Sequence, residues 1–186
     1  MTKYPAVQRK VQEELDEVIG KENAPVIADR KRLPYTDSVL NEILRFGTIL
    51  PAVTRRTSRE CTFRGYHIPK GAYIFANLTI IFRDPQVWAD PEHFNPEANF
   101  PLPLGNPKKV AERCKLDQQF IPFGMGKRVC LGKNLVEQEY FLVFTHLLHK
   151  FTITSHPGHP LPSEYQGTAG LTRGPLPFEV CFLLRK

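Results

Sequence analysis

Two segments in the first quarter of the chain carry hydrophobic residues at the spacing of amphipathic helices. After Pro5, apolar residues recur three or four positions apart until Gly20. In the second segment, Thr36 or Asp37 can cap a helix whose apolar stripe runs to Gly47. We therefore predict two helices, joined by a loop.

The middle of the chain changes from helical spacing to short runs that are typical of strands. The runs 61–68 (CTFRGYHI) and 72–78 (AYIFANL) flank Pro69-Lys70-Gly71, which favours a turn. We therefore predict that these two runs pair as one hairpin. A short helix is predicted within 78–88, and the proline-rich segment 84–122 is predicted to be irregular.

The last third of the chain combines one long helical pattern with a terminal strand. The predicted helix runs from about Leu131 to Lys150 and is strongly apolar, so we expect most of it to be buried. Residues 178–184 read as a strand. The whole pattern predicts an α+β fold, mainly helical, with small antiparallel sheets.

Composition and charge narrow the class of protein. Hydrophobic residues form 41% and charged residues 24% of the 186-residue chain, which is ordinary for a globular protein and argues against disorder. The net charge of +6 favours an acidic partner or an anionic membrane surface. Nucleic acid is not predicted, because no motif that binds it is present. No apolar run approaches a membrane span, and the first ten residues do not form an anchor or targeting peptide.

The segment 120–132 (FIPFGMGKRVCLG) has the most distinctive chemistry of the chain. Its glycines allow sharp turns and close approach to another body. Cys130 stands at the start of the long helix, with Lys127 and Arg128 nearby. Helix dipole, backbone N–H groups and positive charge all stabilise a thiolate. We therefore expect Cys130 to act either as a nucleophile or as a metal ligand.

The neighbouring residues favour a metal ligand. A nucleophile needs a base, and no catalytic signature accompanies the histidines at positions 146, 149, 156 and 159. A zinc site at the cysteine is disfavoured, because no second cysteine joins the His146 and His149 pair. Cys61, Cys114 and Cys181 are interpreted as structural, reduced thiols. Haem is the main metal group that a single cysteine ligates.

Several motifs together resemble the cytochrome P450 superfamily. VLNEILRF (39–46) resembles its conserved helix, with Glu42 and Arg45 at the family's spacing. DPEHFNPE (90–97) resembles the segment that pairs with that helix, although His93 stands where arginine is usual. RGYHIPKG (64–71) resembles the microsomal, drug- and steroid-metabolising branch. The haem-binding signature is matched at five positions: Phe123, Gly126, Arg128, Cys130 and Gly132.

This resemblance implies a thiolate-ligated haem b, iron-protoporphyrin IX, with Cys130 as the proximal iron ligand. Phe123 would pack beside the sulfur, Gly126 would permit the tight turn, and Gly132 would let the helix start close to the macrocycle. Arg128 would pair with a haem propionate. Arg55 matches the position of a second propionate contact in relatives.

Further roles follow from the same resemblance. Glu42 and Arg45 are expected to form a buried network with His93 as its third member, and the histidine would make this network sensitive to pH. An exposed pair worth a few tenths of a kcal/mol is the alternative for Glu42 and Arg45. Residues that could face a substrate are Ile49, Leu50, Val53, Leu171 and Thr172.

The implied function is that of a monooxygenase that inserts one atom of O2 into a lipophilic small molecule. Electrons would come from an NADPH-dependent flavoprotein reductase with an acidic surface, and the protein would lie at the endoplasmic reticulum membrane, with which full-length relatives associate. The resemblance covers only the C-terminal part of a catalytic domain, so residues 1–186 are interpreted as one partial domain. Met1 is compatible with a true start or with an internal methionine of a longer chain. The basic residues that could meet the reductase are Lys108, Lys109, Arg113, Lys115, Lys127 and Lys133; a solvated face is the alternative.

A truncated, catalytically inactive fragment that binds haem, or only partner proteins, is the competing function. The resemblance does not extend to the central helix whose acid and threonine deliver protons to bound oxygen, which keeps this alternative open. A haem absorption spectrum distinguishes the two classes.

Overall fold

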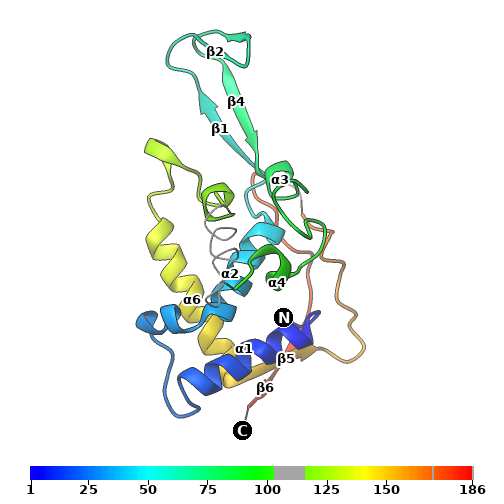
Figure 1. Cartoon of the computed structure of the whole chain (residues 1–186). Coiled ribbons are helices and arrows are strands. Elements are labelled where there is room, and N and C mark those ends of the chain that lie inside the picture. Colours follow the sequence, from blue (N-terminus) through cyan, green and yellow to red (C-terminus); the bar gives the residue numbers. More distant parts are fainter. Residues whose placement is uncertain (103–115, 169, 186) are drawn as a thin grey trace.

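A computed structural model of the chain describes residues 1–102, 116–168 and 170–185. Cys114 and the basic residues Lys108, Lys109, Arg113 and Lys115 lie outside this range. Three longer helices form the body of the molecule, and two β-hairpins project from it (Figure 1). The described chain starts at α1, near the middle of the body, and β6 reaches the end of the body opposite the hairpins (Figure 1). The predicted α+β fold, mainly helical with small antiparallel sheets, is confirmed.

The described elements have the following bounds. The helices are α1 (Pro5–Val18), α2 (Pro34–Gly47), α3 (Leu78–Ile81), α4 (Pro96–Asn99) and α6 (Lys133–Lys150), with 3-10 turns η1 (Ile27–Arg32) and η2 (Gly126–Arg128). The strands are β1 (Ala52–Arg56), β2 (Cys61–Phe63), β3 (Tyr66–Ile68), β4 (Tyr73–Asn77), β5 (Phe151–Ser155) and β6 (Val180–Leu184).

Two hydrophobic clusters hold these elements together. The larger one joins α1, α2 and α6 through fully buried residues such as Leu15, Val39 and Phe141. The smaller one surrounds Trp88, whose ring meets Phe100 at 5.4 Å between centroids. The indole N–H of Trp88 donates to the Ile81 carbonyl at 2.9 Å, so this buried polar group is satisfied. The smaller cluster therefore anchors the described parts of the proline-rich segment, residues 84–102 and 116–122.

Helix α2 begins earlier than predicted. Its first helical residue is Pro34, so neither Thr36 nor Asp37 caps it. The carboxylate of Glu14 in α1 accepts the free backbone N–H groups of Tyr35 at 2.8 Å and Thr36 at 2.7 Å. Proline lacks the N–H that a first helical residue would leave unpaired, which favours it at this position. A side chain from another helix therefore replaces the predicted local cap.

The predicted pairing of the two central strand runs is wrong. Strands β2 and β3 pair with each other across Arg64-Gly65, and β4 pairs with β1 instead. Arg64 and Gly65 have φ of +50° and +83°, the left-handed conformation of a two-residue hairpin turn. Pro69-Lys70-Gly71 instead links one hairpin to the other, where the Gly71 N–H donates to the Thr57 carbonyl.

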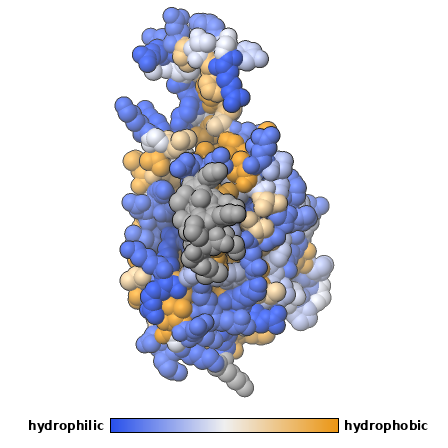
Figure 2. All heavy atoms as spheres, in the orientation of Figure 1, coloured by the Kyte–Doolittle hydropathy of each residue, from blue (hydrophilic) through white to orange (hydrophobic). Residues whose placement is uncertain are grey.

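The long helix α6 is less buried than predicted. The described chain fully buries only Phe141, Thr145 and Leu148 of this helix, whereas Leu135 is 62% exposed and Val143 59% exposed. A helix that is apolar on all sides is normally enclosed by other elements. Figure 2 shows further apolar surface where the projecting hairpins join the body. The described residues thus cover one side of α6 and leave the other open.

The predicted terminal strand is present, and it has a partner that the sequence did not indicate. Strand β6 pairs antiparallel with β5, which follows directly on α6. The last pair of the ladder joins Ser155 and Val180. None of the helices in the described ranges has the length and apolar character needed to cross a bilayer.

Candidate haem-ligand site

The cysteine loop closes on itself just before α6. The Cys130 N–H donates to the Phe123 carbonyl at 2.9 Å, and the Gly124 N–H donates to the Ile121 carbonyl at 2.9 Å. Gly124 and Gly126 have φ of +74° and +70°, which side-chain-bearing residues rarely adopt. These bonds and turns hold Cys130 exposed at the surface.

Helix α6 starts immediately beyond the cysteine. Its N-cap is Gly132, and the Cys130 carbonyl accepts the Lys133 N–H at 3.2 Å. A side-chain carbon placed on Gly132 would lie 3.9 Å from the Cys130 Sγ. The missing side chain keeps the approach to the sulfur open, beside a helix N-terminus that favours negative charge.

Two arginines lie beside the loop. Arg55 on β1 donates from Nη2 to the Arg128 carbonyl at 3.0 Å and from Nη1 to the Thr54 carbonyl at 2.8 Å. The exposed Arg128 guanidinium forms no hydrogen bond or ion pair with any residue of the described ranges. The structure thus brings together both arginines that the family resemblance assigned to the haem propionates.

The surroundings of Cys130 fit a haem. Haem requires an iron ligand, a broad apolar surface and cations for two carboxylates. Cys130 offers the exposed thiol, and Arg55 and Arg128 offer the cations. The apolar surface comes from exposed Met125, Val129 and Leu131 and from half-buried Phe123.

Glu42 and Arg45 are both completely buried in the structure. They form a bidentate ion pair, in which Arg45 Nε donates to Glu42 Oε2 at 2.6 Å and Arg45 Nη2 donates to Glu42 Oε1 at 2.8 Å. The remaining N–H groups of Arg45 donate to the carbonyls of Phe82, Pro91 and His93 at 2.7 to 2.9 Å. All five guanidinium N–H groups are therefore satisfied, as a buried arginine requires.

Glu42 also holds the segment that contains Asn95 and Asn99. Its Oε1 accepts the Asn95 N–H at 2.8 Å and the Asn99 side-chain amide at 3.0 Å. The two asparagines were not singled out from the sequence, and they carry no charge pattern that would have indicated this contact. The pair therefore links α2 to α4, a segment some fifty residues away.

His93 enters this network through its backbone and not through its side chain. Its carbonyl accepts from Arg45, whereas its imidazole is 70% exposed and lies 2.7 Å from Asp90 Oδ1. The expected pH sensitivity through this imidazole therefore loses its structural basis. Hydrogen bonds from Asn95 first, and then from His93, lower the pKa of Asp90 below its ordinary value.

The candidate substrate residues fall into two groups. The Arg173 N–H donates to the Ile49 carbonyl at 2.7 Å, which brings the turn of Leu171 and Thr172 against the segment after α2. Ile49 and Leu171 are exposed. Val53 instead packs against the smaller hydrophobic cluster. The structure therefore places Ile49 and the C-terminal turn together.

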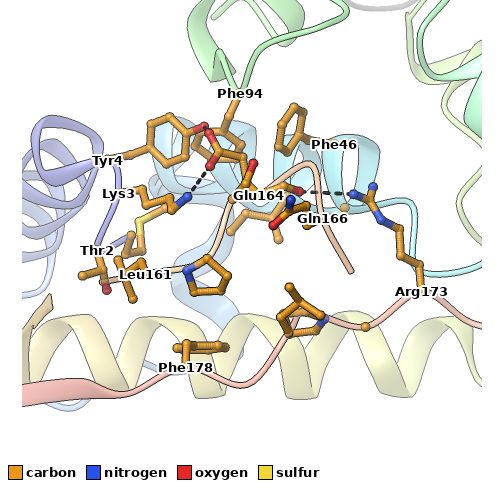
Figure 3. Close-up of a pocket in the computed structure, with 18 of the residues that line it drawn as sticks. Thr2, Lys3, Tyr4, Phe46, Phe94, Leu161, Glu164, Gln166, Arg173 and Phe178 are labelled. Carbon is orange, nitrogen blue, oxygen red and sulfur yellow. Dashed lines mark hydrogen bonds and ion pairs between the residues drawn. The ribbon is translucent and has the colours of Figure 1, made fainter. Parts of the chain in front are cut away.

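A pocket of about 360 Å³, which Ile49 helps to line, lies between the chain start, α2 and the C-terminal stretch (Figure 3). Glu164 is its polar centre. The Lys3 ammonium pairs with Glu164 and, as the largest cause, lowers the pKa of that carboxylate. The Tyr4 hydroxyl donates to Glu164 at 3.1 Å, and burial is the main cause that raises the pKa of Tyr4.

A cluster of His156, His159 and Glu179 was not predicted from the sequence. The two histidines were considered only as bases for Cys130, and Glu179 lies twenty residues beyond them. The spacing of the histidines was visible in the sequence. The contribution of Glu179 depends on how β5 and β6 pair.

Comparison with known proteins agrees with these features. The cytochrome P450 family model matches residues 1–182. Cytochrome P450 2J1 of Oryctolagus cuniculus and cytochrome P450 2D20 of Mesocricetus auratus are each 41% identical over the whole chain, which spans 35% of their length. A zebra fish cytochrome P450 structure with abiraterone matches 98% of the chain and 40% of its own chain, at 32% identity and a TM-score of 0.84. The chain spans about a third of the length of these curated relatives. It belongs to the cytochrome P450 family.

Proposed function

We propose that the chain is the haem-binding portion of a haem-thiolate monooxygenase that acts on a lipophilic small molecule. The observation that carries the proposal is the closed loop 120–132, which holds Cys130 exposed beside two arginines. Membership of the cytochrome P450 family agrees with this chemistry. Residues 1–186 form part of one catalytic domain in this proposal.

Each residue of the loop has a role in holding the cofactor. Cys130 would be the protein ligand of the iron, Gly126 would permit the tight turn, and Gly132 would leave room beside the sulfur. Arg128 and Arg55 would bind the two haem carboxylates by charge-assisted hydrogen bonds. When bound, haem supplies the site for O2 and for one-electron chemistry, and a thiolate ligand favours cleavage of the O–O bond.

The chain itself supplies the orientation and the dry environment of this site. The buried Glu42–Arg45 pair fixes α2 against α4, and α2 leads directly into β1, which carries Arg55. The exposed apolar side chains of the loop, Met125, Val129 and Leu131, would pack against the cofactor and exclude water from the face that they cover. Ile49, Leu50, Val53, Leu171 and Thr172 are the proposed substrate-facing residues.

The proposed electron donor is an NADPH-dependent flavoprotein reductase with an acidic surface. Lys127 and Lys133 are exposed on either side of Cys130, and Lys133 is only weakly paired with Glu137, at 3.9 Å. Positive charge at this position attracts and orients an acidic partner. By analogy with its family, we place the protein at the endoplasmic reticulum membrane.

The absorption spectrum of the reduced, carbon-monoxide-bound protein tests the cofactor. We expect the expressed chain, or a chimaera in which it replaces the matching segment of a 41% identical relative, to show a Soret band shifted far to the red. This shift is specific to a thiolate ligand. A normal Soret position in the haem-loaded chimaera would contradict the proposal.

A partner-binding fragment without catalytic activity is the second candidate function. The exposed apolar residues Leu135 and Val143 on α6 favour it, because they form an uncovered surface that another protein could occupy. Absence of haem from both the chain and the chimaera would support this candidate.

Charge reversal at the basic surface tests the electron donor. In the chimaera, Lys127→Glu and Lys133→Glu should each slow reduction by the flavoprotein at low salt, by about tenfold together, and weaken its salt dependence. Haem content should not change. Lys150→Glu, at the opposite end of α6, is the matched control. Equal reduction rates in all three variants would show that Lys127 and Lys133 are ordinary solvent-exposed residues that do not contact the reductase.

A further inference from the structure

We propose that His156, His159 and Glu179 form a binding site for a divalent transition-metal ion, with zinc as the expected occupant. One ligand atom from each residue lies within 4.8 Å of the ligand atoms of the other two. Two imidazoles and one carboxylate, with a fourth position open to water, match a common set of zinc ligands. Nothing in the proposed haem chemistry uses these residues.

A tight turn brings the two histidines together. The His159 N–H donates to the His156 carbonyl at 3.2 Å, and Gly158 between them has φ of +79°. The two imidazole rings meet edge to face, with 4.7 Å between their centroids. The backbone turn therefore brings the two histidine side chains to the same end of the sheet.

The β5–β6 ladder supplies the third ligand. Its last pair joins Ser155 and Val180, so the next residues along the two strands are His156 and Glu179. Positions opposite each other in an antiparallel ladder lie about 4.5–5.5 Å apart. The sheet therefore holds the backbone of Glu179 beside the histidine turn, although Glu179 lies twenty positions after His159 in the sequence.

The hydrogen-bonding state of the cluster also indicates a missing partner. The Nδ1 atom of His156 is buried and has no hydrogen-bond partner among the described residues. Buried polar atoms are normally satisfied, so this atom is expected to meet a ligand. By contrast, His146 and His149 already contact the carbonyls of Pro25 and Gly20, each at 2.9 Å.

The distances suit a metal ion after a small closure. Zinc lies about 2.0–2.1 Å from nitrogen and oxygen ligands, so tetrahedral ligand atoms lie about 3.3 Å apart. His159 Nδ1 and Glu179 Oε2 are already 3.6 Å apart. Both of these side chains are more than half exposed, so they can rotate inward at little cost. The other ligand atoms, which all lie within 4.8 Å of one another, can come closer by such rotation.

The site is remote from Cys130. Cys130 precedes the first residue of α6, whereas His156 follows β5 beyond the last residue of that helix (Figure 1). A helix of 18 residues spans about 27 Å. Zinc bound here would link the end of β5 to the start of β6. Because the ion would bind the folded chain and not the unfolded one, it would also raise the stability of the fold.

Zinc titration of the full chain, followed by calorimetry and by the rise in melting temperature, tests the proposal. We expect one zinc ion per chain, and at least a ~100-fold loss of affinity in His156→Gln, His159→Gln and Glu179→Gln, because even residues that only support a ligand are worth about 10–100-fold. His67→Gln, which changes an exposed histidine outside the cluster, is the matched control and should bind as the unchanged chain does.

X-ray absorption at the zinc edge separates this site from the thiols. Nitrogen and oxygen ligands at about 2.0–2.1 Å support the cluster, whereas sulfur at about 2.3 Å would assign the ion to a cysteine and overturn the proposal. Zinc binding that survives in all three cluster variants would also overturn it, as would the lack of any one-to-one zinc complex. These measurements do not depend on haem. A negative result for zinc would therefore leave the proposed function unaffected, and a negative result for haem would leave the zinc site unaffected.

Discussion

Cys130→Ser should remove the red-shifted carbonyl band of the haem-loaded chimaera and abolish monooxygenase turnover. Serine has nearly the same size, and the bonds that close the loop come from the backbone of Phe123 and Cys130, so the loop should keep its shape. A serine oxygen is a far weaker donor than a thiolate, which removes the electronic assistance to O–O cleavage. Absorption spectra and product formation measure the two effects.

The other thiols are the controls for this substitution. Cys61 is exposed on β2 and Cys181 is half-buried on β6, and neither belongs to the loop. Cys61→Ser, Cys181→Ser and Cys114→Ser should each keep the red-shifted band. Survival of that band in Cys130→Ser, or its loss in any of the three controls, would assign the ligand to a different residue.

Arg45→Ala should lower the free energy of unfolding by about 3–5 kcal/mol, the usual cost of removing one partner from a buried ion pair. Glu42 would keep its charge in the core after losing two hydrogen bonds at 2.6 and 2.8 Å. Three carbonyls that accept from Arg45 would also lose their donor. The chimaera carrying this change should accumulate with little haem. Denaturant unfolding and haem content measure the result.

Two further substitutions separate burial from charge. Arg32 and Asp29 form a pair of the same spacing at 3.2 Å, but the Arg32 side chain is 61% exposed, so Arg32→Ala should cost about 1 kcal/mol or less. Arg45→Lys keeps the charge and offers three donors instead of five, so it should also be strongly destabilising. If Arg45→Ala is no more harmful than Arg32→Ala, the buried pair does not stabilise the fold.

Much of the local structure could be predicted from the sequence. The apolar spacing after Pro5, the terminal strand and the family signature around Cys130 all depend on residues close together in the chain. The glycine positions in the loop likewise predicted sharp turns, and Gly124 and Gly126 have positive φ in the structure. These features could be read because each depends on spacing within a few residues.

Longer-range pairing could not be read in the same way. The sequence suggested a hairpin across Pro69-Lys70-Gly71, but the paired β1 and β4 enclose β2 and β3. Burial of α6 was overestimated, because apolar spacing reports what a helix can bury and not which elements cover it. His93 was expected to act through its side chain, and only the fold shows that its carbonyl meets Arg45.

By itself, then, the sequence determined the family, the helix that carries Glu42 and Arg45, and the loop that presents Cys130. Only the tertiary structure decided that Glu14 caps α2, that Asn95 and Asn99 complete the buried pair, and that Glu179 meets two histidines. The physical reason is the same in each case. A backbone turn or a helical stripe depends on neighbouring residues, whereas satisfaction of a buried polar group depends on whichever distant segment packing brings within about 3 Å.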